Sequence, residues 1–392
     1  MKKKILPYSR QSISSGDIAS VNKILISDFL TTGPTVKKFE IEISRFCKSK
    51  YSILVNSGTS ALHIACLALN VKKNDIVWTS PITFAASANC ALYCGAKVDF
   101  VDIDPETFNM SSTLLEEKLV QAKKNKKLPK LVIPVHLAGQ SCDMQKIMKL
   151  SQKYGFKIIE DASHAFGGVY KKTKVGSCKY SHITVSSFHP VKIITSGEGG
   201  VAITNSKSLA LQMQSLREHG IERDKKKFLG KSHGSWFYQQ KFLGYNYRMS
   251  DIHAALGISQ LTRIRKFTKE RNLIANYYKK KLIGLPIDFQ KGQKDIYSTF
   301  HLFIILVSKN IHKKLFDFLR KNNIFVNIHY IPVHLHPYYK SLGFQNSQFR
   351  NSINYYNRAI SSPIYYNLKK KDQNNVINLI KKFFKIYSLK KY

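Results

Sequence analysis

One lysine of this chain lies where a charged side chain is unfavourable. Lys192 falls in "SSFHPVKIITSGEGG" (186–200), which joins a strand-like run to a cluster of glycines. The residues around it are mostly apolar and include Phe188, Pro190, Val191, Ile193 and Ile194. Burial disfavours an ammonium group, so it lowers the pKa of a lysine and makes the neutral amine available as a nucleophile. Lys192 is therefore a candidate catalytic residue.

Polar residues at the ends of other strand-like runs could serve the same site. Asp161 follows the apolar part of "FKIIEDAS" (156–163), and its carboxylate could cap the next turn or pair with a buried cation. "SGTSA" (57–61) opens a helix, where backbone N–H groups with the hydroxyls of Thr59 and Ser60 could hold a phosphate. Ordinary helix capping explains the same hydroxyls.

Two further residues belong to strand-like or helical runs next to the same expected site. Ser187 is on the strand-like run that precedes Lys192. Phe84 begins the helical stretch after "TSPIT" (79–83), where its ring could cover a flat molecule. Each residue has an ordinary structural explanation, and only the combination indicates a site.

The elements that must position these residues alternate along the first half of the chain. Sheets of alternating strands and helices are mostly parallel and bind ligands beyond the carboxyl ends of their strands. The expected strands lie in 51–56, 75–80, 97–104, 130–139, 156–163, 182–189 and 199–205. The expected helices between them include 59–69, 84–95 and 143–155, the last ended by Gly155.

The pattern of expected strands and helices changes after a long helical stretch at 248–282. The runs 299–307, 311–323 and 324–333 are typical of a smaller α/β domain. We therefore expect a large domain with an N-terminal arm at 1–250, a linking helical segment at 251–285 and a small C-terminal α/β domain at 286–392.

The set of motifs resembles fold-type I enzymes that use pyridoxal 5'-phosphate, and within them the DegT/DnrJ/EryC1/StrS family of nucleotide-sugar aminotransferases. The resemblance covers nearly the whole chain, from Tyr8 to "SSPIYYN" (361–367). It is carried by "NSGTSALH", "EDASHAFGG", "SFHPVK", "TSGEGG" and "GYNYRMSDIHAALGISQL". Details such as "DFLTTGP" (28–34), "HLAGQSCDM" (136–144) and "HYIPVHLHPYY" (329–339) resemble the branch that makes UDP-4-amino-4,6-dideoxy-N-acetyl-β-L-altrosamine, a precursor of pseudaminic acid.

The resemblance assigns roles to individual residues. It implies that Lys192 forms the Schiff base with the cofactor and shuttles a proton, while Asp161 pairs with the pyridine nitrogen. The phosphate is expected at Thr59, Ser60 and Ser187, with Phe84 on the ring and His164 beside it, where a packing role is equally open for the histidine. Asn246 is expected to reach the phosphate of a second subunit, which implies a homodimer. The expected sugar-nucleotide contacts are Tyr8, Asp28, Phe29, Leu30, Thr31, His329 and Tyr330, with core packing as an alternative for Phe29 and Leu30.

By the same resemblance, the reaction moves an amino group from glutamate to C4 of a UDP-4-keto-6-deoxy-N-acetylhexosamine. Another 4-keto sugar, linked to UDP, dTDP or GDP, is the alternative within the family. Some members are sugar dehydratases with histidine in place of the lysine; here the lysine is present and His189 lies three residues earlier, which favours transamination.

Composition limits the other classes of protein to which this chain could belong. The net charge of +39 would suit a nucleic-acid-binding or regulatory protein, but the lysines are spread in short runs without a nucleic-acid motif, and we expect a solvated surface. No apolar run approaches the roughly 20 residues of a membrane span. The start, "MKKKILPYSR", lacks the apolar stretch of a signal peptide, so we expect a cytoplasmic protein.

Potential metal and redox motifs in the sequence are weak. Neither the six cysteines nor "HLH" (334–336) has the spacing of a metal site, and we expect no metal. Cys90 and Cys94 could share a helical face, where burial as small residues is favoured over redox chemistry.

Overall fold

The computed structural model describes residues 5–389, with side chains described as far as Tyr387. Residues 1–4 and 390–392 lie outside the described residues. They include most of the lysines of the basic start "MKKKILPYSR" and the outer ends of the expected large and small domains.

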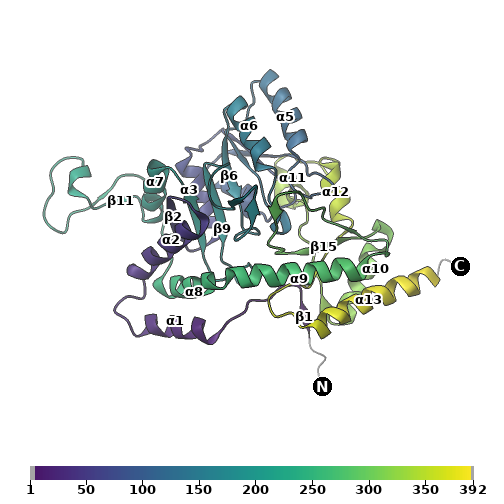
Figure 1. Ribbon diagram of the computed structural model, residues 1–392. Coiled ribbons are helices and arrows are strands. Elements are labelled where there is room, and N and C mark those ends of the chain that lie inside the picture. Colours follow the sequence, from purple (N-terminus) through teal and green to yellow (C-terminus); the bar gives the residue numbers. More distant parts are fainter. Residues whose placement is uncertain (1–4, 390–392) are drawn as a thin grey trace.

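The large part of the molecule is built on one seven-stranded sheet (Figure 1). Strand β10 runs antiparallel to both of its neighbours, and the remaining pairs are parallel, so the expected mostly parallel sheet is confirmed. In spatial order the strands are β2 (Tyr51–Val55), β10 (Gly200–Thr204), β9 (Ile183–Ser187), β6 (Lys157–Asp161), β5 (Leu131–Ile133), β3 (Ile76–Thr79) and β4 (Lys97–Phe100).

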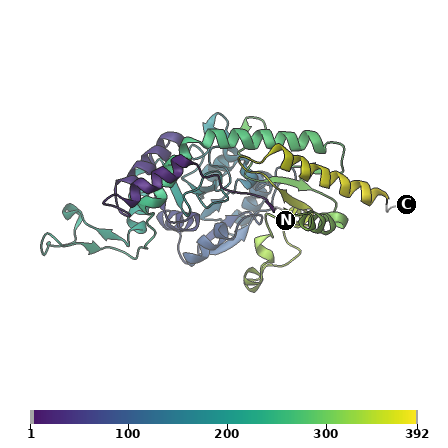
Figure 2. The same cartoon turned by 90° about the horizontal axis from the view of Figure 1, so that it is seen from below.

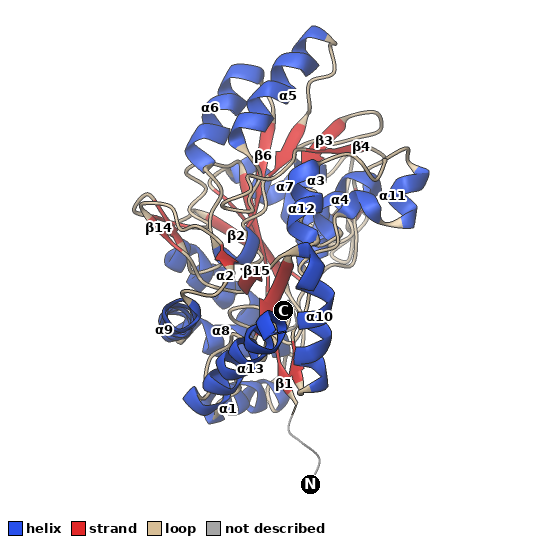
Figure 3. Cartoon of the chain, turned by 90° about the vertical axis from the view of Figure 1, so that its right-hand side faces the viewer, coloured by secondary structure: helices blue, strands red, loops and turns tan. Residues whose placement is uncertain are grey.

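Helices cover both faces of this sheet (Figure 3), which explains why its strands are apolar on both sides. One face is buried under α3 (Gly58–Ala68), α4 (Ala86–Tyr93) and α7 (Lys207–Arg217). The other face packs against α2 (Pro34–Cys47), α5 (Ser112–Lys124), α6 (Met144–Tyr154) and α8 (Asp251–Thr262). Helix α6 ends at Gly155 with φ of 81°, as its sequence pattern predicts.

A second core lies towards the C-terminus, around a three-stranded antiparallel sheet. Its elements are β13 (Asp288–Phe289), β15 (Phe303–Leu306), β17 (Ala359–Ser362), α9 (Ile264–Leu282), α10 (Lys309–Lys321) and α13 (Lys370–Leu389). The N-terminal strand β1 (Leu6–Pro7) joins this region by pairing in parallel with β16 (Ile324–Phe325). The expected domain boundaries stay a prediction. The expected long helical stretch at 248–282 consists of two helices, α8 and α9, separated at Arg263.

The remaining elements are short or peripheral. Helix α1 (Ser15–Leu25) packs on α8, and β7 (Val169–Tyr170), β8 (Thr173–Lys174) and β14 (Ile296–Tyr297) form a small sheet. Helices α11 (Pro337–Ser341) and α12 (Arg350–Tyr356) lie between β16 and β17 in the chain. A hairpin of β11 (Ile221–Glu222) and β12 (Gln239–Gln240) projects away from the body, as Figures 1 and 2 show.

Candidate active site

A cavity of about 410 Å³ lies at the carboxyl ends of β6 and β9. It is lined by the N-terminal ends of α3 and α4, by the turn that carries Lys192, and by residues 327–330, which follow β16. The position agrees with the rule that open α/β sheets bind ligands beyond their strand ends. Nine of the expected site residues line it: Tyr8, Thr59, Phe84, Asp161, His164, Ser187, Lys192, His329 and Tyr330.

Lys192 lies in the turn after β9 and is partly buried, with its backbone N–H donating to the carbonyl of His189 at 2.9 Å. Burial lowers the pKa of Lys192 to about 8, although the nearby carboxylate of Asp161 opposes this shift. About one tenth of Lys192 is therefore a neutral amine at pH 7, far more than for an exposed lysine. Such an amine is a competent nucleophile and proton acceptor.

Asp161, the last residue of β6, is 4% exposed and held from two sides. The hydroxyl of Ser87 donates to Oδ2 at 2.7 Å, and the backbone N–H of Ser163 donates to Oδ1 at 3.0 Å. Thr83 extends this chain, since its hydroxyl oxygen lies 2.8 Å from that of Ser87. A carboxylate fixed in this way can accept a hydrogen bond from a protonated ring nitrogen without a large movement of its own side chain.

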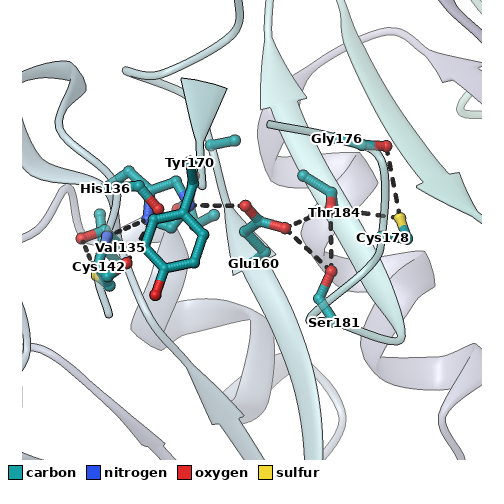
Figure 4. Close-up of polar contacts among 12 residues, drawn as sticks. Val135, His136, Cys142, Glu160, Tyr170, Gly176, Cys178, Ser181 and Thr184 are labelled. Atoms are coloured by element: carbon teal, nitrogen blue, oxygen red, sulfur yellow. Dashed lines mark hydrogen bonds and ion pairs between the residues drawn. The ribbon is translucent and has the colours of Figure 1, made fainter. Parts of the chain in front are cut away.

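The strand end that carries Asp161 is fixed by a buried polar network on β6 (Figure 4). Glu160 accepts from the hydroxyls of Ser181 at 3.0 Å and Thr184 at 2.7 Å, and lies 2.8 Å from Nε2 of His136. Burial raises the pKa of Glu160, but His136 and the two hydroxyls outweigh it and hold that pKa below its usual value. The ionised carboxylate thereby ties β6 to the segments on either side.

At the opposite end of the cavity, the backbone at the start of α3 packs closely against the ends of β9 and β10. A Cβ placed on Gly58 would come within 2.9 Å of the Ser187 Cβ, and one on Gly200 within 2.3 Å of the Ser57 carbonyl oxygen. Only glycine fits at both positions without a shift. The N-terminus of α3, with Thr59 and Ser187 beside it, is consequently open to an anion.

The two serines at the start of α3 have different roles from those that the sequence predicts. Ser57 caps α3 by accepting from the Ser60 N–H at 3.0 Å, and it lines the cavity. Ser60 is buried and its hydroxyl donates to Asn56 Oδ1 at 2.6 Å, so its role as a phosphate ligand stays a prediction. The residue that caps α3 is thus Ser57, and the capping role considered for Thr59 and Ser60 is wrong.

A neutral histidine is hydrogen bonded to Tyr330 at the wall of the cavity. The Ala138 N–H donates to Nδ1 of His164 at 3.3 Å, so Nε2 carries the ring proton and lies 2.9 Å from the Tyr330 hydroxyl. Burial, and then the charge of Lys192, lower the pKa of His164 well below its usual value. The same two causes lower the pKa of His329 to about 3. These histidines therefore add polar surface without positive charge.

The expected residues at 28–31 and Asn246 lie outside this cavity, and all of them are exposed. Phe29 is 52% exposed and Leu30 47%, so the core-packing alternative for these two is wrong. The segment is nevertheless held in place, because the Asp251 N–H donates to the Leu30 carbonyl at 2.9 Å. Substrate or cofactor contacts by these residues stay predictions that need a second copy of the chain.

Sequence reasoning missed several cavity residues, of which Ser57, Ser87 and Glu198 matter most. Ser87 was detectable in principle, because it is a polar residue in an otherwise apolar helix start, one turn after Phe84. Glu198, the acid of "GEGG", is exposed and is one of the residues that line the cavity.

These residues fit pyridoxal 5'-phosphate. The cavity combines a near-neutral amine, a hydrogen-bonded buried carboxylate and an anion-accepting helix start. Phe84 is 62% exposed at the cavity wall, with its ring centroid 6.3 Å from that of Tyr330, so it can cover a bound ring. The cofactor's aldehyde, pyridine nitrogen and phosphate each have a chemically matched partner.

Solved structures with the same architecture define the class. An aminotransferase of Helicobacter pylori involved in pseudoaminic acid biosynthesis is 28% identical, with a TM-score of 0.88 over 97% of this chain and 100% of that one. A putative sugar aminotransferase of Streptococcus pneumoniae in its PMP-form is 28% identical, with a TM-score of 0.89 over 99% of this chain and 100% of that one. Together, fold and site define a pyridoxal-phosphate-dependent sugar aminotransferase.

Sequence comparison gives the family. Residues 11–381 match the DegT/DnrJ/EryC1/StrS aminotransferase family, and the chain belongs to it. A UDP-4-amino-4,6-dideoxy-N-acetyl-β-L-altrosamine transaminase of Campylobacter jejuni is 37% identical over 94% of each chain. A GDP-perosamine synthase of Vibrio cholerae is 31% identical over 97% of this chain and 99% of the other. The expected family, fold class and cofactor are confirmed.

None of the helices in residues 5–389 combines the length and hydrophobicity that a bilayer-spanning segment requires.

Proposed function

We propose that this aminotransferase moves an amino group from glutamate to C4 of a UDP-4-keto-6-deoxy-N-acetylhexosamine. The product is UDP-4-amino-4,6-dideoxy-N-acetyl-β-L-altrosamine, for pseudaminic acid synthesis. The observation that carries the chemistry is the pairing of Lys192, with its pKa of about 8, and Asp161 in one cavity. The similarity to the Campylobacter jejuni transaminase supports the choice of sugar.

The chain's own residues divide the work of the reaction. When bound, pyridoxal phosphate supplies a carbonyl that combines with amines and a ring that withdraws electrons. Asp161 would keep the proton on the ring nitrogen, and the N-terminus of α3 with Thr59 and Ser187 would bind the phosphate. The Nζ atom of Lys192, once free as an amine, would move a proton from the donor carbon to the cofactor in the first half of the reaction and from the cofactor to C4 of the sugar in the second.

The surrounding side chains orient and shield this transfer. Phe84 and the pair of His164 and Tyr330 form walls of the cavity. Because burial keeps His164 neutral, it can donate a hydrogen bond through Nε2 without competing for the proton that Lys192 carries.

The test offers purified protein glutamate with a panel of 4-keto nucleotide sugars and identifies the aminosugar by NMR. We expect the UDP-linked N-acetylhexosamine to be converted, and Lys192→Ala to be inactive on every member of the panel. Conversion of only GDP- or dTDP-linked sugars would overturn the proposed substrate. An active Lys192→Ala variant would overturn the proposed chemistry.

A different 4-keto nucleotide sugar is the second candidate. The relative named GDP-perosamine synthase matches nearly the whole chain, so the same backbone supports a GDP-linked substrate in that protein. The same panel distinguishes the two.

We infer further that the working unit is a homodimer. The hairpin formed by β11 and β12 stands away from the body and carries exposed Leu229 and Trp236, each 76% exposed (Figure 2). Exposed apolar side chains of this size are typical of surfaces that another chain covers. In the dimer, Asn246 would reach the partner's phosphate site, and residues 28–31 would contact the substrate bound by the partner.

Two other features complete the proposal. The chain divides into a large domain at 1–250, a helical link at 251–285 and a small domain at 286–392, as the separate hydrophobic cores support. The reaction takes place in the cytoplasm, for which six free cysteines are suited.

A further inference from the structure

A second cavity lies apart from the active site, where β8 and β14 meet the end of α2 and the start of α9. Its volume is about 200 Å³, against about 410 Å³ for the active-site cavity, and the two have no lining residue in common. Side chains from four elements form its walls: Phe46 on α2, Lys174 at the end of β8, Arg265 and Thr268 on α9, and Tyr297 on β14.

Backbone packed against a helix forms another part of the wall. Gly167 has φ of 97°, and a Cβ placed on it would come within 2.9 Å of Cδ1 of Ile264, the first residue of α9. Only glycine fits there without a shift. Gly167 follows the active-site residue His164 by three positions, so the second cavity lies close in sequence to the active site and is separate from it.

Two positive side chains line this cavity, and no aspartate or glutamate of the described chain does so. Neither Lys174 nor Arg265 forms an ion pair with a carboxylate among residues 5–389. Burial, and after it the charge of Arg265, lower the pKa of Lys174; Lys48 adds to this effect and the Cys47 thiol opposes it. The two cations therefore repel each other, and an anion between them would stabilise both.

The other wall residues leave recognition to these two cations. The Lys174 Nζ atom lies 5.2 Å from the centroid of the Phe46 ring, a cation–π contact that holds the ammonium group at the wall. The Thr268 hydroxyl donates to the carbonyls of Ile264 and Arg265, at 3.1 Å each, so its proton is already used within α9. The start of α9 adds the positive end of a helix dipole.

We propose that this cavity binds a small organic dianion, a phosphomonoester or a dicarboxylate, between Lys174 and Arg265. The planar guanidinium group of Arg265 can bind two oxygens of a phosphate or carboxylate, and Lys174 supplies the second positive charge. Phe46 and Ile264 offer apolar surface to the carbon part of the ligand. The volume is below the roughly 300–1,000 Å³ of pockets for drug-sized ligands, which limits the ligand to a small metabolite. This inference does not rest on the proposed function.

The first experiment is isothermal titration calorimetry on holoenzyme dialysed free of unbound cofactor. Inorganic phosphate, glycerol 3-phosphate and succinate are the anionic probes, and glycerol is the uncharged comparison. We expect at least one of the two organic anions to bind at one site per chain, and Lys174→Met and Arg265→Met each to weaken its Kd at least about 10-fold. The tighter of the two identifies the chemistry of the ligand. Glycerol should not bind.

Lys266→Met is the matched control. Lys266 is exposed, follows Arg265 directly on α9 and does not line the cavity, so its substitution removes the same unit of charge from the +39 of the chain. Its Kd should stay within about twofold of wild type. Equal weakening by all three substitutions would show attraction by diffuse surface charge and would overturn the proposal, as would absence of binding by every anion. Arg265 is exposed, so Arg265→Met keeps the test valid if Lys174→Met does not fold.

The second experiment locates the anion in the wild-type protein. Lysines are acetylated with N-hydroxysuccinimidyl acetate, and the rates are followed by peptide mass spectrometry with and without the tighter-binding organic anion. At about ten times its Kd, the rate at Lys174 should fall about 10-fold and the rate at Lys266 should not change. Equal protection of the two lysines, or none at Lys174, would overturn the proposal. Failure of the proposed function appears separately, as a protein without bound cofactor or without transamination.

Discussion

Lys192 is surrounded by groups that keep positive charge away from it. Burial and then the charge of Lys192 lower the pKa of His164 well below its usual value, and burial, then His164, then Lys192 do the same for His301, so both rings are neutral. Asp161 is the acid whose charge opposes the effect of burial on Lys192. The lysine can thus change its protonation near neutral pH while its neighbours do not, which suits a group that must both accept and return a proton.

The lowered pKa of Lys192 predicts a stability penalty that depends on pH. Burial brings the pKa of Lys192 to about 8 in the folded protein, against the model-peptide value of 10.5. Below pH 8 both states are protonated and the folded state carries the full penalty; between pH 8 and 10.5 the unfolded state binds more protons, so wild-type stability rises with pH. Cofactor-free Lys192→Met lacks this penalty and should be more stable than wild type at pH 7, on the order of 2 kcal/mol.

Urea unfolding at pH 7 and pH 9.5 measures this difference. The advantage of Lys192→Met should shrink at the higher pH, and Lys192→Arg, which keeps its charge, should show no advantage at pH 7. An advantage of equal size at both pH values would contradict the assigned cause.

Ser87 is the residue on which the position of the Asp161 carboxylate depends most directly. Ser87→Ala removes a charge-assisted hydrogen bond of 2.7 Å, and a loss of about 1.5–3 kcal/mol predicts a fall of at least about 10-fold in kcat. Single-turnover kinetics should show the fall in the proton-transfer step. Ser87→Thr should recover part of it, and Ser141→Ala, which loses only a bond to the Cys142 carbonyl, should not reproduce it. An unchanged rate would remove Ser87 from the site.

At the scale of elements, α8 and α2 meet through one buried carboxylate. Asp251 is 0% exposed and accepts from the N–H groups of Gly33 at 2.7 Å, Thr35 at 2.8 Å and Val36 at 3.3 Å. It therefore caps the N-terminus of α2 from the first turn of a helix more than 200 residues later in the chain. The same residue donates through its backbone to Leu30, so it also fixes the segment expected to contact substrate.

Asp251→Ala leaves three partly buried N–H groups without an acceptor and should lower the free energy of unfolding by about 2–4 kcal/mol. Chemical denaturation measures this loss. Asp75→Ala is the matched control, because Asp75 accepts from a single backbone N–H in an exposed turn and should lose less than about 1 kcal/mol. Equal effects of the two substitutions would show that the cap does not connect the helices.

The sequence predicted those elements whose ends are marked by a change of residue type. Asp161 was placed at a strand end because an apolar run stops there, and Gly155 at a helix end because only glycine takes its φ readily. Ser187 was placed on the expected strand 182–189, whereas β9 ends at Ser187 itself. The antiparallel direction of β10 was not predictable, since a buried strand has the same apolar pattern in either direction. The hairpin of β11 and β12 was not predictable because each strand has only two residues and neither contributes a buried side chain.

The candidate site was predictable to the extent that chemistry alone marks its residues. Lys192 and Asp161 are unusual at apolar positions, so the sequence singled them out. Ser57 and Ser87 are ordinary residues whose importance comes from packing, which places one at the start of α3 and the other 2.7 Å from Asp161. The pattern at 28–31 could not show that its apolar side chains remain exposed in a single chain.

At the scale of the whole molecule, the charge of +39 is a property of the surface. The lysine runs at 123–127, 225–227 and 369–371 are exposed, as expected for solvated side chains. Lys279, in the run at 279–281, is the partial exception: it is partly buried and burial lowers its pKa. Such a field favours the approach of an anionic nucleotide sugar and weakens as salt is added.

The proposed dimer makes a prediction that no single chain can satisfy. If Asn246 serves the partner's site, Lys192→Ala and Asn246→Ala chains are each inactive or strongly impaired alone. A mixed dimer, however, has one intact site, built from the Lys192 of one chain and the Asn246 of the other. Equal mixing with random exchange puts half of the dimers in the mixed form, which restores about a quarter of wild-type activity.

The mixing experiment requires reversible exchange of subunits, confirmed by mass spectrometry of chains that carry different tags. Activity is then followed as the fraction of mixed dimers increases. A proportional rise would place Asn246 in the partner's site, because neither parent contains both groups at one site. No gain over the parents at a measured mixed fraction of one half would show that Asn246 acts within its own chain, where its side chain is exposed outside the cavity.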